Sequence, residues 1–320
     1  TLLSRKGYFQ QTFNDEGWQL EKPVNWIPES LLERIDGKVL VSIEDRDVKV
    51  QAWLYRTKSP TGGEVPVLLL DTDIPGNLPE DRKITDHLYG GDKRYRLKQE
   101  IILGIGGVRL LQFLGFQIRK YHLNEGHASL LTIELLNHHR RPREDRWDDH
   151  ITWSTAHVQE RCVFTTHTPV EAGHDHFPYD MVNRIMGEVI PLDLLKRLGG
   201  KDELNMTMLA LNLSHFVNGV AKKHGEVSQA LFPGFEIHAI TNGIHPFTWA
   251  SPYLINLYNQ YLPGWANEPE LFVRVDNIPD HEIYDAHIGA KAYLFQYVTE
   301  VTGVELDLEV FTIGFARRVT

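Results

Sequence analysis

From residue 95 onward, short apolar runs of strand character alternate with longer segments of helical period. Predicted strands cover 116–123, 161–166 and 236–241, and predicted helices cover 95–114, 128–138, 206–224 and 280–302. Strands that alternate with helices of this length need crossover connections, which are right-handed and place the strands in parallel. The chain is therefore expected to be of the α/β class, built on a parallel sheet.

The first 75 residues follow a different pattern. Runs rich in β-branched and aromatic residues at 38–43, 48–55 and 65–70 are separated by turns at 44–47 and 59–63. The first turn is acidic and the second contains proline and two glycines. Short strands joined by such turns form hairpins. This region is therefore expected to be an antiparallel β meander.

Polar residues follow three of the predicted strands, at the point where each strand ends. The first strand leads into Asn124–His127, the second into Thr166–Pro169 and the third into Thr241–His245. In an open α/β sheet, ligands bind outside the carboxyl ends of the strands. Three strands thus deliver polar side chains to one edge of the sheet, which predicts a binding site there.

Length and charge limit the class of protein. A chain of 320 residues is long enough for two domains, and its net charge of −10 argues against a nucleic acid or an anionic membrane as the main partner. No apolar run approaches the roughly 18 residues of a membrane-spanning helix. The single cysteine, Cys162, excludes an intrachain disulfide and fits a reducing compartment such as the cytoplasm.

The histidines invite a metal-site interpretation, which their spacing disfavours. His122 and His127 are five positions apart, whereas a helical zinc pair is four apart. Pro169 and Gly173 make the segment that carries His167, His174 and His176 a loop. Hydrogen-bonding roles toward a polar ligand are favoured, and no metal is assigned.

Two glycine-containing segments have structural interpretations. Gly104, Gly106 and Gly107 do not complete a dinucleotide-binding fingerprint, because its third glycine would fall at Arg109, so close helix packing is expected. Asn218 and Gly219 are poor helix formers inside a predicted helix, which indicates close backbone approach to a neighbour or a ligand. For Asn242, before Gly243, a simple turn and a functional role both stay open.

Five ordered motifs closely resemble the α-glucan (glycogen, starch and maltodextrin) phosphorylase family, particularly its shorter bacterial and archaeal branch. The motifs are Tyr121–Ala128, Phe164–Asp175, Asn205–Ala210, Val217–Ala221 with His224–Glu226, and Thr241–His245. Arg5–Gln11 and Tyr95–Glu100 also look like segments of this family. The resemblance covers essentially the whole chain.

The resemblance implies a glycosyltransferase B-type fold, in which two Rossmann-like domains enclose the active site. Residues 1–242 would be the distal part of the N-terminal Rossmann-like domain, with the β meander at about 36–75. Residues 243–320 would form the crossover helices and the first core strand of the C-terminal domain, with that strand in the apolar run before Arg317 and Arg318. On this interpretation the chain is an internal piece of a larger enzyme.

The implied reaction is phosphorolysis of the terminal α-1,4-linked glucose of an α-glucan, which yields glucose 1-phosphate. By resemblance, His167 would be catalytic: it would hold the terminal glucose, with its backbone carbonyl facing the anomeric carbon. The implied substrate-binding residues are Glu125, His127, Thr168, Val220 and Asn242. Partners would be the α-1,4-glucan and inorganic phosphate, and family members commonly form homo-oligomers.

Pyridoxal phosphate is the implied cofactor, but no lysine of this chain matches the family's cofactor motif, so the cofactor-binding residues are unknown. The glycine-rich phosphate loop of the family is also missing. The piece alone is therefore expected to be inactive or nearly so. Alternatives are a non-catalytic α-glucan-binding fragment and a nucleotide-sugar glycosyltransferase of the same fold.

Overall fold

The computed structural model describes residues 1–7, 10–22, 24, 26–88, 91–140 and 153–315. These residues form two compact units. The first contains 1–57 and 66–242, and the second contains 58–65 and 243–320. The large hydrophobic core lies entirely within the first unit, and a small separate core lies in the second.

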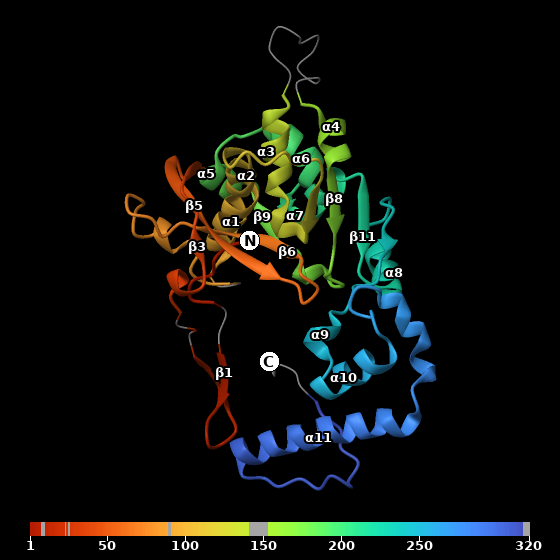
Figure 1. Ribbon diagram of the computed structural model, residues 1–320. Coiled ribbons are helices and arrows are strands. Elements are labelled where there is room, and N and C mark those ends of the chain that lie inside the picture. The colour runs from red at the N-terminus through yellow and green to blue at the C-terminus, as the bar shows by residue number, and fades with distance from the viewer. Residues whose placement is uncertain (8–9, 23, 25, 89–90, 141–152, 316–320) are drawn as a thin grey trace. The chain divides into compact units, whose positions relative to one another are not determined.

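The described strands and helices follow the chain order shown in Figure 1. The strands are β1 (Gln10–Phe13), β2 (Gln19–Lys22), β3 (Glu33–Arg34), β4 (Val39–Ile43), β5 (Arg46–Lys58), β6 (Glu64–Asp71), β7 (Tyr121–Asn124), β8 (Cys162–Thr165), β9 (His176–Pro178), β10 (Glu203–Asn205), β11 (Phe216–Gly219) and β12 (His238–Ala239). The α-helices are α1 (Lys93–Ile101), α2 (Gly107–Phe113), α3 (Leu130–His138), α4 (Thr155–Arg161), α5 (Tyr179–Met186), α6 (Leu192–Gly199), α7 (Met206–Asn212), α8 (Lys222–Leu231), α9 (Pro246–Trp249), α10 (Pro252–Tyr261) and α11 (Asp280–Thr302).

A four-stranded parallel sheet forms the centre of the first unit, in the order β12-β11-β8-β7. Leu123 and Phe164 are fully buried because helices cover the sheet. Figure 1 shows β8 and β11 running side by side, as their ladder of hydrogen bonds requires. The predicted parallel α/β architecture is thereby confirmed. The glycosyltransferase B type is a more specific assignment, which we treat as a proposal.

The N-terminal sheet confirms the predicted meander in part. Strands β4 and β5 pair antiparallel from Val39↔Val50 to Ile43↔Arg46, and β6 pairs with β5. The sequence pattern missed β3, which also pairs with β5, and the separate hairpin of β1 and β2. Both are short, and their side chains are mostly exposed, so they carry little of the apolar alternation that reveals a strand.

The predicted helix over 95–114 is present as α1, a π-helical turn η3 (Ile102–Gly106) and α2 in succession. A Cβ atom added to Gly104 would lie 2.7 Å from the backbone nitrogen of Leu131 on α3. Glycine at this position lets the two helices approach closely, which confirms the packing interpretation of Gly104. Gly115 follows α2 with φ of +78°, as expected for a glycine that ends a helix.

The prediction of one helix over 206–224 is wrong. The segment forms α7, then strand β11, then the start of α8. Val217 is 5% exposed and pairs with Phe164 of β8, so tertiary pairing decides its conformation. Asn218 and Gly219 therefore lie on a buried strand and do not interrupt a helix. Four residues are too few for periodicity to reveal a strand between two helices.

The second unit is mainly helical. Its core contains Leu257, Leu262, Trp265 and Ile278, and α11 spans the predicted residues 280–302. The strand expected in the apolar run at 306–313 is not formed, and its side chains are exposed. A strand exists only through hydrogen bonds to a neighbouring strand, and no described strand pairs with this run. Arg317 and Arg318 lie outside the described residues.

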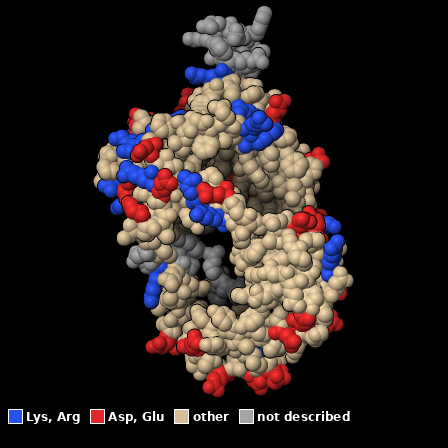
Figure 2. All heavy atoms as spheres, viewed as in Figure 1, with Lys and Arg blue, Asp and Glu red and all other residues tan. Residues whose placement is uncertain are grey.

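Charged side chains of both signs are interspersed on the face shown in Figure 2. Between the N-terminal sheet and α1, Glu44 pairs with Arg46 at 3.2 Å, with Lys98 at 2.9 Å and with Arg94. These three cations share the Glu44 carboxylate, and Arg46 also pairs with Asp81 at 2.9 Å.

Candidate active site

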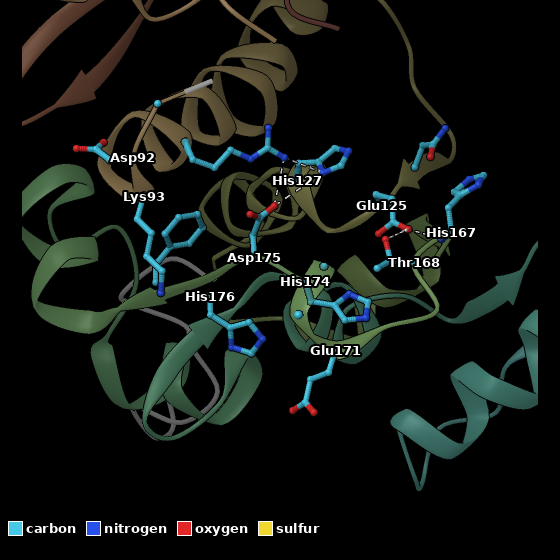
Figure 3. Close-up of a pocket in the computed structure, with 16 residues that line it drawn as sticks. Asp92, Lys93, Glu125, His127, His167, Thr168, Glu171, His174, Asp175 and His176 are labelled. Carbon is cyan, nitrogen blue, oxygen red and sulfur yellow. Dashed lines mark hydrogen bonds and ion pairs between the residues drawn. The ribbon is translucent and has the colours of Figure 1, made fainter. Parts of the chain in front are cut away.

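A cleft of about 940 Å³ lies in the first unit at the carboxyl ends of β7 and β8. Its walls come from three places: the turn after β7, the loop from His167 to Phe177 and the start of α1. Figure 3 shows the side chains that line it. The cleft therefore lies where the polar ends of the parallel strands were predicted to gather.

Backbone hydrogen bonds continue the sheet ladder beyond the ends of its strands. The Glu125 N–H donates to the carbonyl of Thr165 at 2.9 Å, and the Thr166 N–H donates to the carbonyl of Asn218 at 3.0 Å. The Asn242 N–H donates to the carbonyl of Val220 at 3.1 Å. The tips of the four strands are consequently held next to one another along a single edge.

Glu125 links the tip of β7 to the tip of β8. Its Oε1 atom accepts hydrogen bonds from the backbone N–H of His167 and, at 3.1 Å, from the hydroxyl of Thr168. Its Oε2 atom accepts from the Gly126 N–H at 3.3 Å. The backbone of Glu125 has φ of +67° and ψ of 169°, a conformation that residues other than glycine rarely adopt. Strain of this kind gathers at functional sites, where surrounding contacts enforce it.

Behind the tips, a row of side chains crosses three strands. The Thr165 hydroxyl donates to Oδ1 of Asn218 at 2.9 Å, and it lies 2.7 Å from Nε2 of His122. A hydroxyl has one proton, so Thr165 accepts from His122 while it donates to Asn218. The row fixes the side chains of β7, β8 and β11 immediately behind the cleft.

A charged cluster closes the opposite wall of the cleft. A terminal nitrogen of Arg96 lies 3.0 Å from Nδ1 of His127 and 3.2 Å from Oδ2 of Asp175. The Nε of Arg96 lies 3.0 Å from Oε1 of Glu100, whose side chain is 1% exposed. The dashed lines in Figure 3 mark the contacts around His127 and Asp175. The cluster joins α1, the turn after β7 and the loop after β8.

Burial and neighbouring charges perturb the groups in this wall. Burial, and then the positive charge of Arg96, lower the pKa of His127. Burial, and then the negative charge of Asp175, raise the pKa of Glu100 well above its usual range. Burial also lowers the pKa of His174, whose Nδ1 lies 2.9 Å from the Thr207 hydroxyl. In each of these three groups, burial disfavours the charged form.

The structure brings four of the six predicted site residues together and places the other two farther along the edge. Glu125, His127, His167 and Thr168 line the cleft. His167 is half-buried, and its imidazole makes no hydrogen bond within the described part of the chain. Val220 and Asn242 lie at the tips of β11 and beyond β12, and neither lines the cleft.

Sequence reasoning missed the importance of Arg96, Glu100 and Asp175. A usable signal was present, because Arg96 and Glu100 are an i, i+4 pair of opposite charge next to the buried Leu97 and Ile101. When charged residues lie next to buried apolar residues on a helix, they seldom serve only as a solvent-exposed surface. Asp175 lies in a loop, and a loop residue gives no such signal.

Within the described ranges, no group of three or more His, Cys, Asp or Glu side chains is arranged to hold a metal ion. Among the same residues, no helix combines the length and the apolar character needed to span a bilayer.

No model of a known protein family matches the chain. Individual proteins do match it, over nearly its whole length. It is 35% identical to maltodextrin phosphorylase of Thermococcus litoralis, with 99% of the chain aligned to 41% of that protein. It is also 35% identical to glycogen phosphorylase of Mycobacterium tuberculosis, over 99% of the chain and 42% of the relative.

The chain is a homologue of the α-glucan phosphorylases. Glycogen phosphorylase of Aquifex aeolicus is 30% identical over 98% of the chain and 50% of its own length. The chain thus spans between two fifths and one half of the length of these three relatives. The cleft belongs to the part that is shared with these phosphorylases.

Proposed function

We propose that the protein that contains this chain is an α-glucan phosphorylase. It would transfer the terminal α-1,4-linked glucose of a glucan to inorganic phosphate and release glucose 1-phosphate. The observation that carries the proposal is the alignment of almost the whole chain with glycogen and maltodextrin phosphorylases. The cleft supports it, because a ligand-sized cavity lies at the polar ends of the shared parallel strands.

The chemistry of the cleft suits a hexose. A glucosyl unit presents several hydroxyl groups, each of which needs a donor and an acceptor when water is removed. Imidazole, carboxylate and hydroxyl groups of His127, Glu125 and Thr168 supply both kinds of partner around the cleft. Glu125 already accepts three hydrogen bonds from the protein. A carboxylate offers about four acceptor positions, so it retains room for one sugar hydroxyl.

We assign the catalytic position to His167. The imidazole of this residue is free to bind sugar hydroxyls, while Glu125 fixes its backbone. In our proposal its carbonyl faces the anomeric carbon, where an acceptor oxygen stabilises the positive charge of an oxocarbenium-like transition state. Thr168 lies beside it. We further propose that a sugar extending along the strand edge beyond the cleft would meet Val220, which would line its pocket, and Asn242, which would bind a glucose hydroxyl.

The two-domain assignment remains part of the proposal. Residues 1–242 would belong to the first Rossmann-like domain of a glycosyltransferase B fold, and residues 243–320 would begin the second. The parallel sheet of the first unit supports the first half of this assignment. Because the chain spans half or less of the three relatives, we propose that it does not turn over substrate by itself.

The cleft does not fit pyridoxal phosphate. Among the described residues that line it, Lys93 is the one lysine, and it is an exposed residue in the first turn of α1. A lysine that forms an imine must be unprotonated, which burial promotes and exposure does not. We propose that the cofactor belongs to the whole protein and is held by residues outside this cleft.

The function can be tested by assaying phosphorolysis of maltoheptaose in the polypeptide encoded by the complete gene. Glucose 1-phosphate should form only when inorganic phosphate is present, and His167→Ala should abolish it. The matched control is His281→Ala, which removes an exposed histidine of α11. Release of a nucleotide from a nucleotide sugar, without phosphorolysis, would instead identify a nucleotide-sugar glycosyltransferase.

A second candidate follows from the short span of the chain relative to its relatives. The isolated chain would be a glucan-binding fragment without activity. Isothermal titration calorimetry with maltopentaose tests this candidate. Binding that His167→Ala removes and His281→Ala retains would support it, and the absence of binding at millimolar sugar would eliminate it.

A further inference from the structure

One wall of the cleft contains a hydrogen-bonded arrangement that determines which nitrogen of His127 carries a proton. A terminal NH₂ group of Arg96 lies 3.0 Å from Nδ1 of His127 and 3.2 Å from Oδ2 of Asp175. One N–H of this group can be directed to each acceptor. The guanidinium has donors and no acceptor, and it does not lose its charge in proteins. Nδ1 must therefore be the atom with the lone pair.

The proton of the neutral ring is consequently on Nε2, on the opposite edge of the imidazole. No described residue makes a hydrogen bond to Nε2, and this atom is not among the buried polar atoms that lack a partner. His127 lines the cleft, and its side chain is 30% exposed. Nε2 thus presents its N–H to the open cleft.

Arg96 is itself held from two sides. Its Nε lies 3.0 Å from Oε1 of the buried Glu100, one helical turn further along α1. Asp175 is anchored because its backbone carbonyl accepts the Met206 N–H at 3.1 Å, at the start of α7. The guanidinium is therefore tied to its own helix and to the loop after β8, and its approach to His127 is preset.

The charges that face His127 also oppose its protonation. Arg96 and His167 disfavour the imidazolium, whereas Asp175 and Glu125 favour it. Burial has the largest effect, Arg96 adds to it, and the balance lowers the pKa of the ring. A second proton on Nδ1 would have to displace the Arg96 N–H from that atom.

We propose that Arg96, oriented by Glu100 and Asp175, is a positioning residue that fixes His127 as the neutral Nε2–H tautomer, with its N–H directed into the cleft. His127 would therefore donate a hydrogen bond to an acceptor oxygen of the ligand, and it would not accept one. The identity of that oxygen as a glucan hydroxyl or ring oxygen rests on the proposed function. The tautomer itself does not depend on it.

Nuclear magnetic resonance of the chain labelled with ¹⁵N-histidine tests the tautomer directly. The chain has 16 histidines, and the ring signals of His127 are those missing from the spectrum of His127→Gln. At neutral pH the proton should be found on Nε2, with Nδ1 unprotonated. An Nδ1–H tautomer or an imidazolium at this pH would overturn the proposal.

Arginine variants test the role of Arg96. Arg96→Gln should abolish the fixed tautomer and give averaged ring signals, whereas Arg96→Lys, which keeps a cationic donor, should restore it. Arg94→Gln is the matched control, because Arg94 lies on the same helix but pairs with Glu44. If Arg96→Gln does not fold, Glu100→Gln is a milder change and should broaden the His127 signals. Unchanged ring signals in folded Arg96→Gln or Glu100→Gln would contradict the positioning role.

Maltopentaose separates this proposal from the proposed function. When the sugar is added, the Nε2 signal of His127 should shift in the wild-type chain and not in Arg96→Gln. If the Nε2–H tautomer is fixed but the His127 signal does not shift with the sugar, the positioning role of Arg96 is supported and glucan binding in the cleft is contradicted. If the His127 signal shifts with the sugar but the ring is not held in one tautomer, glucan binding is supported and the positioning role of Arg96 is overturned.

Discussion

The carboxylate of Glu125, at the end of β7, accepts a hydrogen bond from the backbone N–H of His167, at the end of β8. Together with the hydrogen bonds from the Thr168 hydroxyl to Glu125 and from the Glu125 N–H to the Thr165 carbonyl, this contact joins the two strand tips that line the cleft. Glu125 makes it from a backbone conformation with φ of +67°. A contact that requires an unfavourable backbone is retained only where neighbouring interactions support it.

Replacing Glu125 separates its two effects on stability. Glu125→Ala removes the acceptor and keeps the positive φ, so it should lower the free energy of unfolding by about 1–3 kcal/mol. Glu125→Gly removes the same acceptor but relieves the backbone strain, which costs about 1–3 kcal/mol at such a position, so it should be clearly more stable than the alanine variant. Urea denaturation measures both. Equal stability of the two variants would show that the backbone of Glu125 is not strained.

A methyl group at Gly104 should disrupt helix packing. In Gly104→Ala the added Cβ would lie 2.7 Å from the Leu131 nitrogen and 2.9 Å from a carbon of Leu130. Overpacking of this kind costs about 1–3 kcal/mol. The matched control is Gly107→Ala, where the nearest atom would be 3.7 Å away and the gain in helix propensity is up to about 1 kcal/mol. Thermal unfolding should rank Gly107→Ala above Gly104→Ala, and the reverse order would contradict the close helix contact.

Acidification should destabilise the fold through its buried histidines. Burial lowers the pKa of His174 from its ordinary value of 6.5, so the unfolded chain takes up a proton at a higher pH than the folded one. Stability is therefore lost as pH falls below about 6.5, down to the pKa in the folded state. His174→Gln should flatten the decline in unfolding free energy between pH 7.5 and about 5. A decline as steep as that of the wild type would rule out a titration of His174 in this range.

The single cysteine provides a probe of local opening. Cys162 is fully buried in β8, and burial raises the pKa of its thiol to about 12. The thiolate is the reactive form, so a thiol reagent at pH 8 should label native protein only as fast as the strand opens. Labelling should accelerate steeply with urea and become immediate in unfolded protein. Rapid stoichiometric labelling without urea would contradict the burial of β8.

Local signals explain which elements the sequence could predict. Helix α11 has acidic residues in its first turn, and Gly303 ends it with φ of +73°, so both its ends could be read directly. Strand β11 gave no such signal, because its four residues adopt strand geometry only by pairing with β8. The run at 306–313 shows the reverse case, since strand-like residues without a pairing partner formed no strand.

The same contrast applies to the site. Glu125, His167 and Thr168 could be found because they directly follow predicted strands, and sheet topology brings strand ends together. The cluster of Arg96, His127 and Asp175 could not be assembled in advance, because its members lie far apart in the chain. Their contacts depend on how α1 packs against the loop after β8, which no local pattern specifies.

The most direct test of the central claim is a crystal structure of the chain with maltopentaose. The account predicts the terminal glucose in the cleft at the carboxyl ends of β7 and β8, with its hydroxyls within hydrogen-bond distance of His167 and His127. A sugar bound elsewhere on the chain, or a cleft without sugar in crystals in which the sugar is saturating, would contradict the account.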